Sequence, residues 1–148
     1  MSGRTFFDTN VLVYAVSRDD KRADRAEALL SEGGVVSVQV LNEFAAVAQR
    51  KLGMSWPEVI DTLAAFRKLC APPVPVTLET HEAALRITVQ YGYGIYDGLI
   101  LAAALAAGCT TLLSEDMQDG QVIDSKLTIR NPFETRGGRG PRDEEQAR

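Results

Sequence analysis

Hydrophobic and polar residues alternate in two different rhythms along the chain. Short apolar runs, rich in aromatic and β-branched residues, separate longer stretches in which apolar residues recur every three or four positions. The first rhythm is typical of buried strands and the second of amphipathic helices. We expect strands at Thr5–Phe7, Val35–Val38, Val74–Val76, Thr110–Leu113 and Lys126–Ile129.

The longer stretches predict helices. They cover Thr9–Val16, Lys21–Ser31, Gln39–Leu52, a segment that starts at Ser55, a segment from Leu78 or Glu79 to Val89, and a segment from Ile95 or Tyr96 to Ala107. Within them, Ile60 and Leu69 are expected to face inward with the other apolar residues of their helix. The stretch Leu99–Ala107 is apolar on nearly all sides, which predicts a buried helix.

The alternation of strands and helices predicts an α/β domain with a parallel sheet and helices on both of its faces. With 148 residues, the chain has the size of one domain. We assign residues 1–133 to this domain. The segment Glu134–Arg148 lacks apolar residues apart from Ala147 and is rich in Gly, Arg and acids, so it is expected to be a disordered C-terminal tail.

Composition limits the compartment and the class of partner. A hydrophobic content of 45% and a charged content of 24% are typical of a globular, soluble chain. The sequence shows no signal peptide, and its apolar runs fall short of the roughly 20 residues of a membrane span. We therefore expect a cytoplasmic protein without a membrane anchor. The net charge of −4 argues against a surface coated with basic residues but leaves a local nucleic-acid-binding patch open.

Cysteine and histidine are scarce. Cys70 and Cys109 lie in apolar contexts without metal-ligand spacing, so we expect two buried thiols. The single histidine, His81, is expected at the surface near a helix start. A zinc site and a Ser-His-Asp triad are both disfavoured by these numbers.

Two acids follow predicted strands directly. Asp8 ends the first strand, and Asp116 lies just past Thr110–Leu113. In an open parallel sheet, ligands bind beyond the carboxyl ends of the strands. Asp8 and Asp116 can therefore share one crevice.

Two further acids lie on inner helix faces. Glu43 comes three residues after Val40 and four before Val47, so it points with the apolar stripe of its helix. Asp97 precedes Ile100 by three residues and lies in the first turn of the most apolar helix. Its side chain is therefore expected on a buried face.

Each of these acids has a simpler structural explanation. Asp8 and Asp97 could cap helices, and Glu43 could lie at a solvated rim. All four together favour one site. Converging carboxylates repel one another, which favours a cation between them, and their hard oxygen ligands suit Mg²⁺ or Mn²⁺. A metal held in this way can activate water against a phosphodiester.

Four motifs resemble those of a known family. DTNVLVY, VLNEF, YDGLILAAA and LLSEDMQDG occur in this order between about Arg4 and Phe133 and are similar to motifs of the PIN-domain nucleases, above all the VapC-type toxins of bacterial toxin–antitoxin pairs. The resemblance assigns the family's catalytic and metal-binding acids to Asp8, Glu43, Asp97 and Asp116. Its small polar supporting positions correspond to Thr9 or Asn10 and to Ser114, with Asp119 a nearby acid of open role.

The resemblance implies a Rossmann-like three-layer αβα fold with a short, mostly parallel sheet. It further implies bound Mg²⁺ or Mn²⁺, cleavage of single-stranded or looped RNA, a homodimer, and inhibition by a cognate antitoxin protein laid across the active site. The residue pattern adds Arg18, Arg22 and Arg25 as candidates that guide the RNA backbone, although exposed helix faces often have such charges.

Other α/β families also place acids at strand ends. A phosphotransferase of the haloacid-dehalogenase kind needs a second Asp where this chain has Asn10. A receiver domain needs a strand-end Lys, and a dinucleotide-binding domain needs glycines directly after the first strand, far from Gly92 and Gly94. A catalytically silent module with the PIN fold, or a metal-dependent phosphatase of another α/β family, remains the alternative function.

Overall fold

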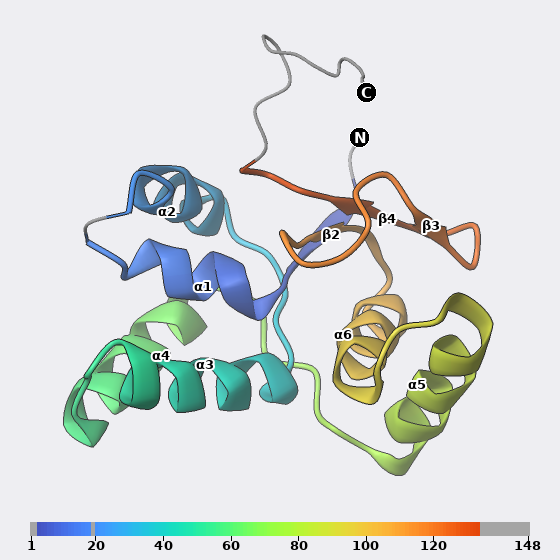
Figure 1. Cartoon of the computed structure of the whole chain (residues 1–148), viewed down its shortest axis with the longest axis horizontal. Coiled ribbons are helices and arrows are strands. Elements are labelled where there is room, and N and C mark those ends of the chain that lie inside the picture. The colour runs from blue at the N-terminus through green and yellow to red at the C-terminus, as the bar shows by residue number, and fades with distance from the viewer. Residues whose placement is uncertain (1–2, 19, 134–148) are drawn as a thin grey trace, which may run out of the picture.

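Strand β1 (Arg4–Phe7) pairs in parallel with β2 (Cys109–Leu113). β2 pairs in parallel with β4 (Leu127–Arg130), and the short strand β3 (Val122–Ile123) runs antiparallel to β4. The computed structural model describes residues 3–18 and 20–133, and the predicted tail Glu134–Arg148 lies outside them. The strand order is β1-β2-β4-β3 (Figure 1), which confirms the expected α/β class with a mostly parallel sheet.

Two isolated bridges extend the sheet beyond β1. Phe6 pairs in parallel with Val35, and Ser37 pairs in parallel with Val74. The predictions of full strands at Val35–Val38 and Val74–Val76 are therefore wrong, although both segments lie where strands were expected.

Local chemistry explains why these two segments stay short. The Ser37 side chain accepts the Val40 N–H and so begins a helix at once. Pro73 and Pro75 flank Val74 and have no N–H to donate to a neighbouring strand. The edge of the sheet is thus limited to single bridges, through Val35 and Ser37 on the first segment and Val74 on the second.

The order in which successive chain segments join the sheet reverses at β1. The extended residues that follow β1 in the sequence, at Val35 and Ser37, lie on one side of it, and β2 lies on the other. A reversal of this kind opens a crevice at the carboxyl ends of the strands. Asp8 follows β1 directly and therefore lies at this crevice.

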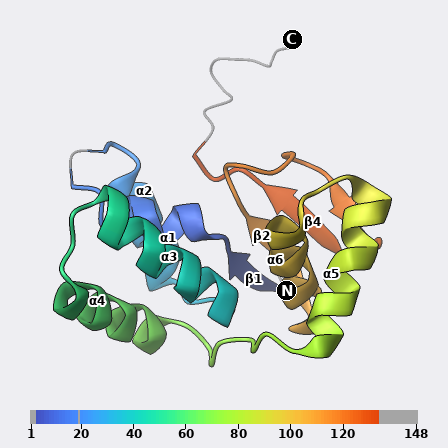
Figure 2. The same ribbon diagram turned by 60° about the horizontal axis from the view of Figure 1, so that its bottom comes forward.

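Six helices are described around the sheet. In Figures 1 and 2, α1 to α4 lie on one side of β1 and α5 with α6 on the other, as a three-layer α/β fold requires. Their bounds are α1 (Thr9–Ala15), α2 (Ala23–Ser31), α3 (Val38–Lys51), α4 (Trp56–Leu69), α5 (Leu78–Tyr91) and α6 (Ile95–Ala106).

Polar side chains fix the starts of two outer helices. Ser55 and Glu58 form a reciprocal capping box at α4, with Pro57 in the first turn. Thr77 and Thr80 do the same at α5. These bonds satisfy amide protons that have no partner within the helix.

Helix α6 packs against β2 and α5 and is buried from Gly98 to Ala104, as its apolar sequence predicted. Within the described part of the chain, no helix is both long and apolar enough to cross a membrane. On the outer helix α4, the inward prediction is wrong for Ile60, which is 64% exposed, and for Leu69 at 46%. Apolar spacing identifies the inward face of a helix correctly. It overstates the width of that face when only a narrow stripe of the helix contacts the core.

The isolated cysteines and histidine lie mostly as expected. Cys109 is buried at the start of β2, and His81 is exposed near the start of α5. Cys70 is only half-buried, so the prediction of a fully buried thiol is wrong there. Its position at the end of α4, at the margin of the core, explains the difference.

Gly98 sets the close contact between α5 and α6. A Cβ at this position would lie 2.8 Å from the Ala84 carbonyl oxygen and 2.9 Å from the Thr88 Oγ1. Gly98→Ala should therefore destabilise the protein by about 1–2 kcal/mol, because overpacking outweighs the better helix propensity of Ala. Urea denaturation measures this change.

Gly94→Ala is the matched control, because a Cβ there meets nothing within 4 Å. Gly94→Ala should cost clearly less than Gly98→Ala. Equal stability of the wild type and the Gly98→Ala variant would contradict the close contact.

Candidate active site

The Asp8 carboxylate lies between two strand ends. The Asp8 N–H donates to the Leu113 carbonyl at 3.0 Å, which joins the ends of β1 and β2. Asp8 Oδ1 accepts the Thr9 N–H at 2.7 Å as the N-cap of α1, and Oδ2 accepts the Ser114 hydroxyl at 2.7 Å. The side chain thus serves as a helix cap and is also held at the crevice, with only 4% of the residue exposed.

This burial changes the acidity of Asp8. Loss of solvent raises the pKa of Asp8 from 3.8 to about 7, and the neighbouring charges of Asp97 and Asp116 act in the same direction, against the hydrogen bonds from Ser114 and Thr9 that lower it. In the metal-free protein, a proton therefore competes for this carboxylate near neutral pH.

Glu43 reaches the crevice from α3, whose N-cap is Ser37. Its Oε1 accepts the Thr9 hydroxyl at 2.8 Å, and its Oε2 accepts the Gln39 side-chain amide at 3.0 Å. The bond to Thr9 links α3 to the first residue of α1 across the chain. Glu43 therefore points inward, as its place on the apolar stripe predicted.

Asp116 lies in the loop after β2. The Asn10 amide donates to Asp116 Oδ2 at 3.3 Å, and the Ser114 Oγ accepts the Asp116 N–H at 3.2 Å and the Met117 N–H at 3.3 Å. Asp116 itself is exposed, so its carboxylate faces the open side of the crevice. Ser114 is fully buried and joins this loop to Asp8.

Asp97 completes the group from the first turn of α6. Gly94 is the N-cap of α6 and no side chain caps it, so Asp97 is not the N-cap residue. Partial burial raises the pKa of Asp97, and the charges of Glu43 and Asp116 raise it further. Asp97 therefore senses the charges of both Glu43 and Asp116.

The three polar residues proposed as supports each donate to a different acid. Thr9 donates to Glu43, Asn10 to Asp116 and Ser114 to Asp8. Asp119 instead accepts the backbone N–H of Asn131 at 2.9 Å, just after β4. The supports orient carboxylates, as outer-shell partners do in metal sites.

The donor set suits a hard divalent ion in its chemistry. All four acids present oxygen, and burial together with neighbouring acids raises the pKa values of Asp8 and Asp97, which favours a cation nearby. Across residues 3–18 and 20–133, however, no three acidic, His or Cys side chains are spaced closely enough to hold an ion as they stand. Binding of an ion would require the side chains to draw together.

Glu115 fastens the loop that contains Ser114 and Asp116. It accepts the Tyr14 hydroxyl and, at 2.9 Å, the guanidinium of Arg22, which also lies 4.1 Å over the Tyr14 ring. Burial and Glu115 together raise the pKa of Tyr14 to about 12. The sequence does not reveal this contact, because Arg22 and Glu115 are 93 residues apart.

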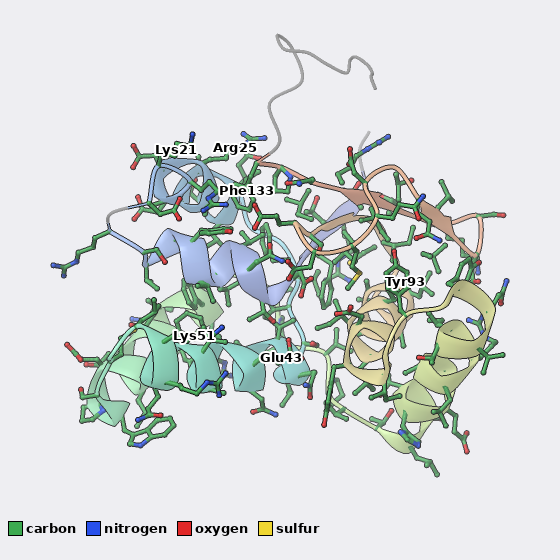
Figure 3. All side chains as sticks on the ribbon, in the orientation of Figure 1. Lys21, Arg25, Glu43, Lys51, Tyr93 and Phe133 are labelled. Atoms are coloured by element: carbon green, nitrogen blue, oxygen red, sulfur yellow. The ribbon has the colours of Figure 1, made fainter. Side chains whose placement is uncertain are left out.

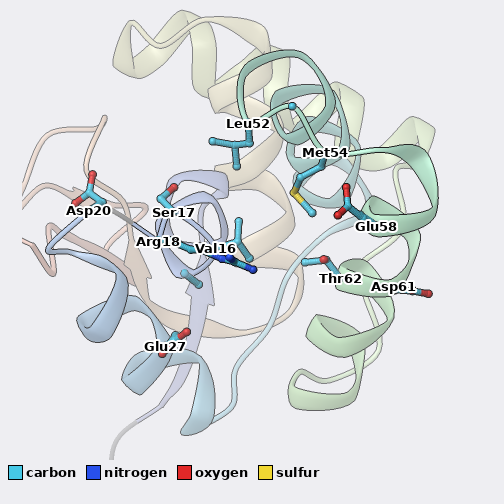
Figure 4. Close-up of a pocket in the computed structure, with 12 residues that line it drawn as sticks. Val16, Ser17, Arg18, Asp20, Glu27, Leu52, Met54, Glu58, Asp61 and Thr62 are labelled. Carbon is cyan, nitrogen blue, oxygen red and sulfur yellow. The ribbon is translucent and has the colours of Figure 1, made fainter.

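The three arginines proposed to guide RNA lie apart from the carboxylates. Arg22 is bound to Asp20 as well as Glu115, and Arg25 donates to the Pro132 carbonyl at 3.2 Å. Arg18 lines a cavity of about 1000 Å³ at the far end of α1 (Figure 4). None of the four predicted catalytic acids lines that cavity. Its other charged residues are different acids, namely Asp20, Glu27, Glu58 and Asp61.

A second pocket, of about 430 Å³, lies directly beside the carboxylates. Glu43 and Asp116 line it, and so do Arg50 and Lys51 from the last turn of α3. Sequence reasoning missed these two cations. The spacing could have revealed Arg50, because it follows Glu43 by seven residues and so lies on the same helix face.

Comparison with known families now decides the assignment. The family model described as "PIN domain" matches residues 5–118, a range that includes all four acids. The chain belongs to the PIN-domain family. Its nucleases generally use divalent metal ions, which agrees with the donor set above. A search of curated protein sequences finds no match.

Solved structures with the same fold include three from bacterial toxin systems. The Mycobacterium tuberculosis toxin VapC20, described as cleaving the Sarcin–Ricin loop, is 21% identical, with 76% of this chain and 91% of that chain covered and a TM-score of 0.62. A Klebsiella pneumoniae toxin–antitoxin complex is 20% identical, with 88% and 99% covered and a TM-score of 0.65. VapBC2 from Rickettsia felis, bound to a promoter DNA fragment, is 21% identical, with 86% and 97% covered and a TM-score of 0.62.

The buried Asp8 should make metal-free stability depend on pH. The folded protein binds this proton more tightly than the unfolded chain, so its advantage is full below pH 3.8 and is lost as the pH rises through about 7. In EDTA, the free energy of unfolding should fall by up to about 3 kcal/mol between pH 5 and pH 8 because of this group. Urea titrations at the two pH values measure the fall.

Asp8→Asn provides the comparison, because it cannot titrate. The variant loses a buried hydrogen bond to Ser114, which costs about 1–3 kcal/mol at both pH values. Its stability should nevertheless fall less than that of the wild type between pH 5 and pH 8. Parallel pH profiles for the two proteins would show that Asp8 ionises normally.

Proposed function

We propose that the chain is a divalent-metal-dependent endoribonuclease and the toxin of a VapBC-type toxin–antitoxin pair. The observation that supports this most is the arrangement of Asp8, Glu43, Asp97 and Asp116 at the crevice of a PIN domain. Their side chains come from four separate segments and influence one another electrostatically. A purely structural role does not require four acids at one place.

In this proposal the four acids hold Mg²⁺ or Mn²⁺, directly or through water. The ion would supply a Lewis acid for the phosphate and an activated water for attack. The residues of the chain pre-organise the site: Ser114 holds Asp8, Thr9 holds Glu43, and Asn10 restrains Asp116. These hydrogen bonds would orient the carboxylates, although the side chains must still draw together to hold the ion.

RNA is the proposed substrate. One of the similar structures is that of a toxin described as cleaving the Sarcin–Ricin loop, an RNA target of that protein. Asp116 lies at the open side of the crevice, where a phosphodiester can reach the acids. The proposed compartment is the cytoplasm, where RNA and an antitoxin would both be available.

An antitoxin protein and a second copy of the chain are the proposed partners. Similar structures include a toxin–antitoxin complex and VapBC2. The outer face of α4 exposes Trp56 and Ile60, and α5 exposes Leu78, Leu85 and Val89 along one side. Exposed apolar stripes on two helices support protein–protein contacts.

A catalytically silent PIN-fold module is the alternative. The observation in its favour is that no three potential ligands among the described residues are arranged to hold an ion. The two proposals differ in RNA cleavage, which the silent module lacks.

Asp97→Asn should reduce RNA cleavage in Mg²⁺ or Mn²⁺ by at least about 100-fold, since loss of an outer-shell partner alone can cost that much. Asp24→Asn is the matched control, because Asp24 lies in the first turn of α2 as Asp97 lies in the first turn of α6. Gel analysis of a labelled RNA measures the rates, and urea denaturation in EDTA should find Asp97→Asn at least as stable as the wild type. Equal cleavage by both variants would remove Asp97 from the site.

Induced expression of the chain in bacteria should arrest growth if it is a toxin. The Asp97→Asn variant should not arrest growth at the same protein level, and co-expression of a small protein encoded beside the gene should restore growth with the wild type. Culture density and immunoblots measure both effects. Normal growth with abundant wild-type protein would contradict the toxin assignment while leaving nuclease activity to the cleavage assay.

A further inference from the structure

The pocket beside the carboxylates is lined by both acidic and basic side chains. The acids Glu43, Glu115 and Asp116 line it, and so do Arg50 and Lys51, which lie about two helical turns after Glu43 on α3. Val13 and Val47 also line it. A volume of about 430 Å³ falls within the range of about 300–1000 Å³ that small-ligand sites occupy.

Arg50 and Lys51 are available to a ligand. Both are exposed, and no ion pair or hydrogen bond of either is found within residues 3–18 and 20–133. Arg22 and Arg86, by contrast, are paired with acids. Arg50 and Lys51 therefore have N–H donors that are free to bind a ligand, whereas Arg22 and Arg86 already donate to carboxylates.

Position on α3 aligns these cations with the acids. Arg50 lies two helical turns after Glu43 on the same face, about 10 Å along the axis. Figure 3 shows Lys51 further along α3 than Glu43, while Arg25 on α2 and Lys21 just before α2 lie beyond α1. A bound polyanion that runs from the acids along α3 would therefore reach Arg50 and Lys51 only after it has passed the carboxylates.

Basic residues at the end of a helix are also favoured by the helix dipole alone. Arg67 and Lys68 occupy the same place in the last turn of α4. They do not line the pocket, so the dipole accounts for them fully. The pair on α3 differs in lining the same pocket as the acids.

An anionic substrate needs such charges. The carboxylates repel a polyanion, and cations in the same pocket offset this repulsion for a phosphate beside the one that is attacked. The valines that line the pocket suit a ribose or a base. We propose that this pocket is the subsite for the nucleotide next to the cleaved bond, with Arg50 and Lys51 bound to its backbone phosphate. This subsite rests on the proposed ribonuclease function.

Binding without turnover tests the subsite. A fluorescein-labelled single-stranded RNA of 12 nucleotides is titrated with the full chain in EDTA, and fluorescence anisotropy gives the dissociation constant at several salt concentrations between 50 and 200 mM. The double variant R50A/K51A should bind at least about tenfold more weakly at 50 mM salt. The slope of log K against log salt should become shallower by about 0.7 for each phosphate that the variant no longer neutralises.

R67A/K68A is the matched control, since it removes the same two charges from the same part of another helix. This variant should bind RNA within about twofold of the wild type. Because all four side chains are exposed, urea denaturation should find both double variants folded. Equal losses in the two double variants, or no RNA binding by the wild type, would overturn the subsite.

Cleavage measured separately in Mn²⁺ distinguishes this proposal from the one on which it rests. If the wild type cleaves RNA and R50A/K51A binds and cleaves as R67A/K68A does, the ribonuclease stands and the subsite is wrong. If R50A/K51A selectively loses RNA binding but the wild type cleaves nothing, the subsite stands as an RNA-binding site and the nuclease is wrong.

Discussion

Burial of a carboxylate at the end of β1 is the constraint on which the site depends. Asp8 caps α1, accepts the Ser114 hydroxyl and is nearly inaccessible to water. Its backbone N–H and Ser114 both tie it to the chain leaving β2, so the ends of two strands cannot separate without uncovering it. A charge in such a place is costly unless it is neutralised by a proton or a cation. The fold thus favours binding of a proton or a cation at Asp8.

Hydrogen bonds and ion pairs around Asp8 hold the neighbouring segments in place. Thr9 links Glu43 to α1, while Glu115, bound by Tyr14 and Arg22, fastens the loop that bears Asp116. Arg22 does not neutralise the four acids, because Asp20 and Glu115 occupy its donors. Arg50 and Lys51 on α3 have no such ion pair within the described residues, and they line the pocket beside Glu43 and Asp116. In the proposed function, binding of the metal and binding of the substrate would be separate tasks of neighbouring surfaces.

Sequence reasoning found the acids because strand ends and helix faces are local properties. Asp8 follows an apolar run and Glu43 keeps the period of its helix, so both positions could be derived before any contact was known. Strand length failed at Val74, where flanking prolines prevent pairing although the apolar pattern is that of a strand. The partnership of Arg22 with Glu115 depends on tertiary packing, which no periodicity encodes. Family motifs supplied what local patterns could not, namely the expectation that these four acids form one site.

Calorimetric titration of the metal-free protein with Mn²⁺ tests the central claim that these acids act on one cation. The account predicts that the wild type binds Mn²⁺ and that single variants of the four acids each bind it at least about tenfold more weakly. The variants are Asp8→Asn, Glu43→Gln, Asp97→Asn and Asp116→Asn. Binding by all four variants with the affinity of the wild type, or no binding by a folded wild type, would contradict it.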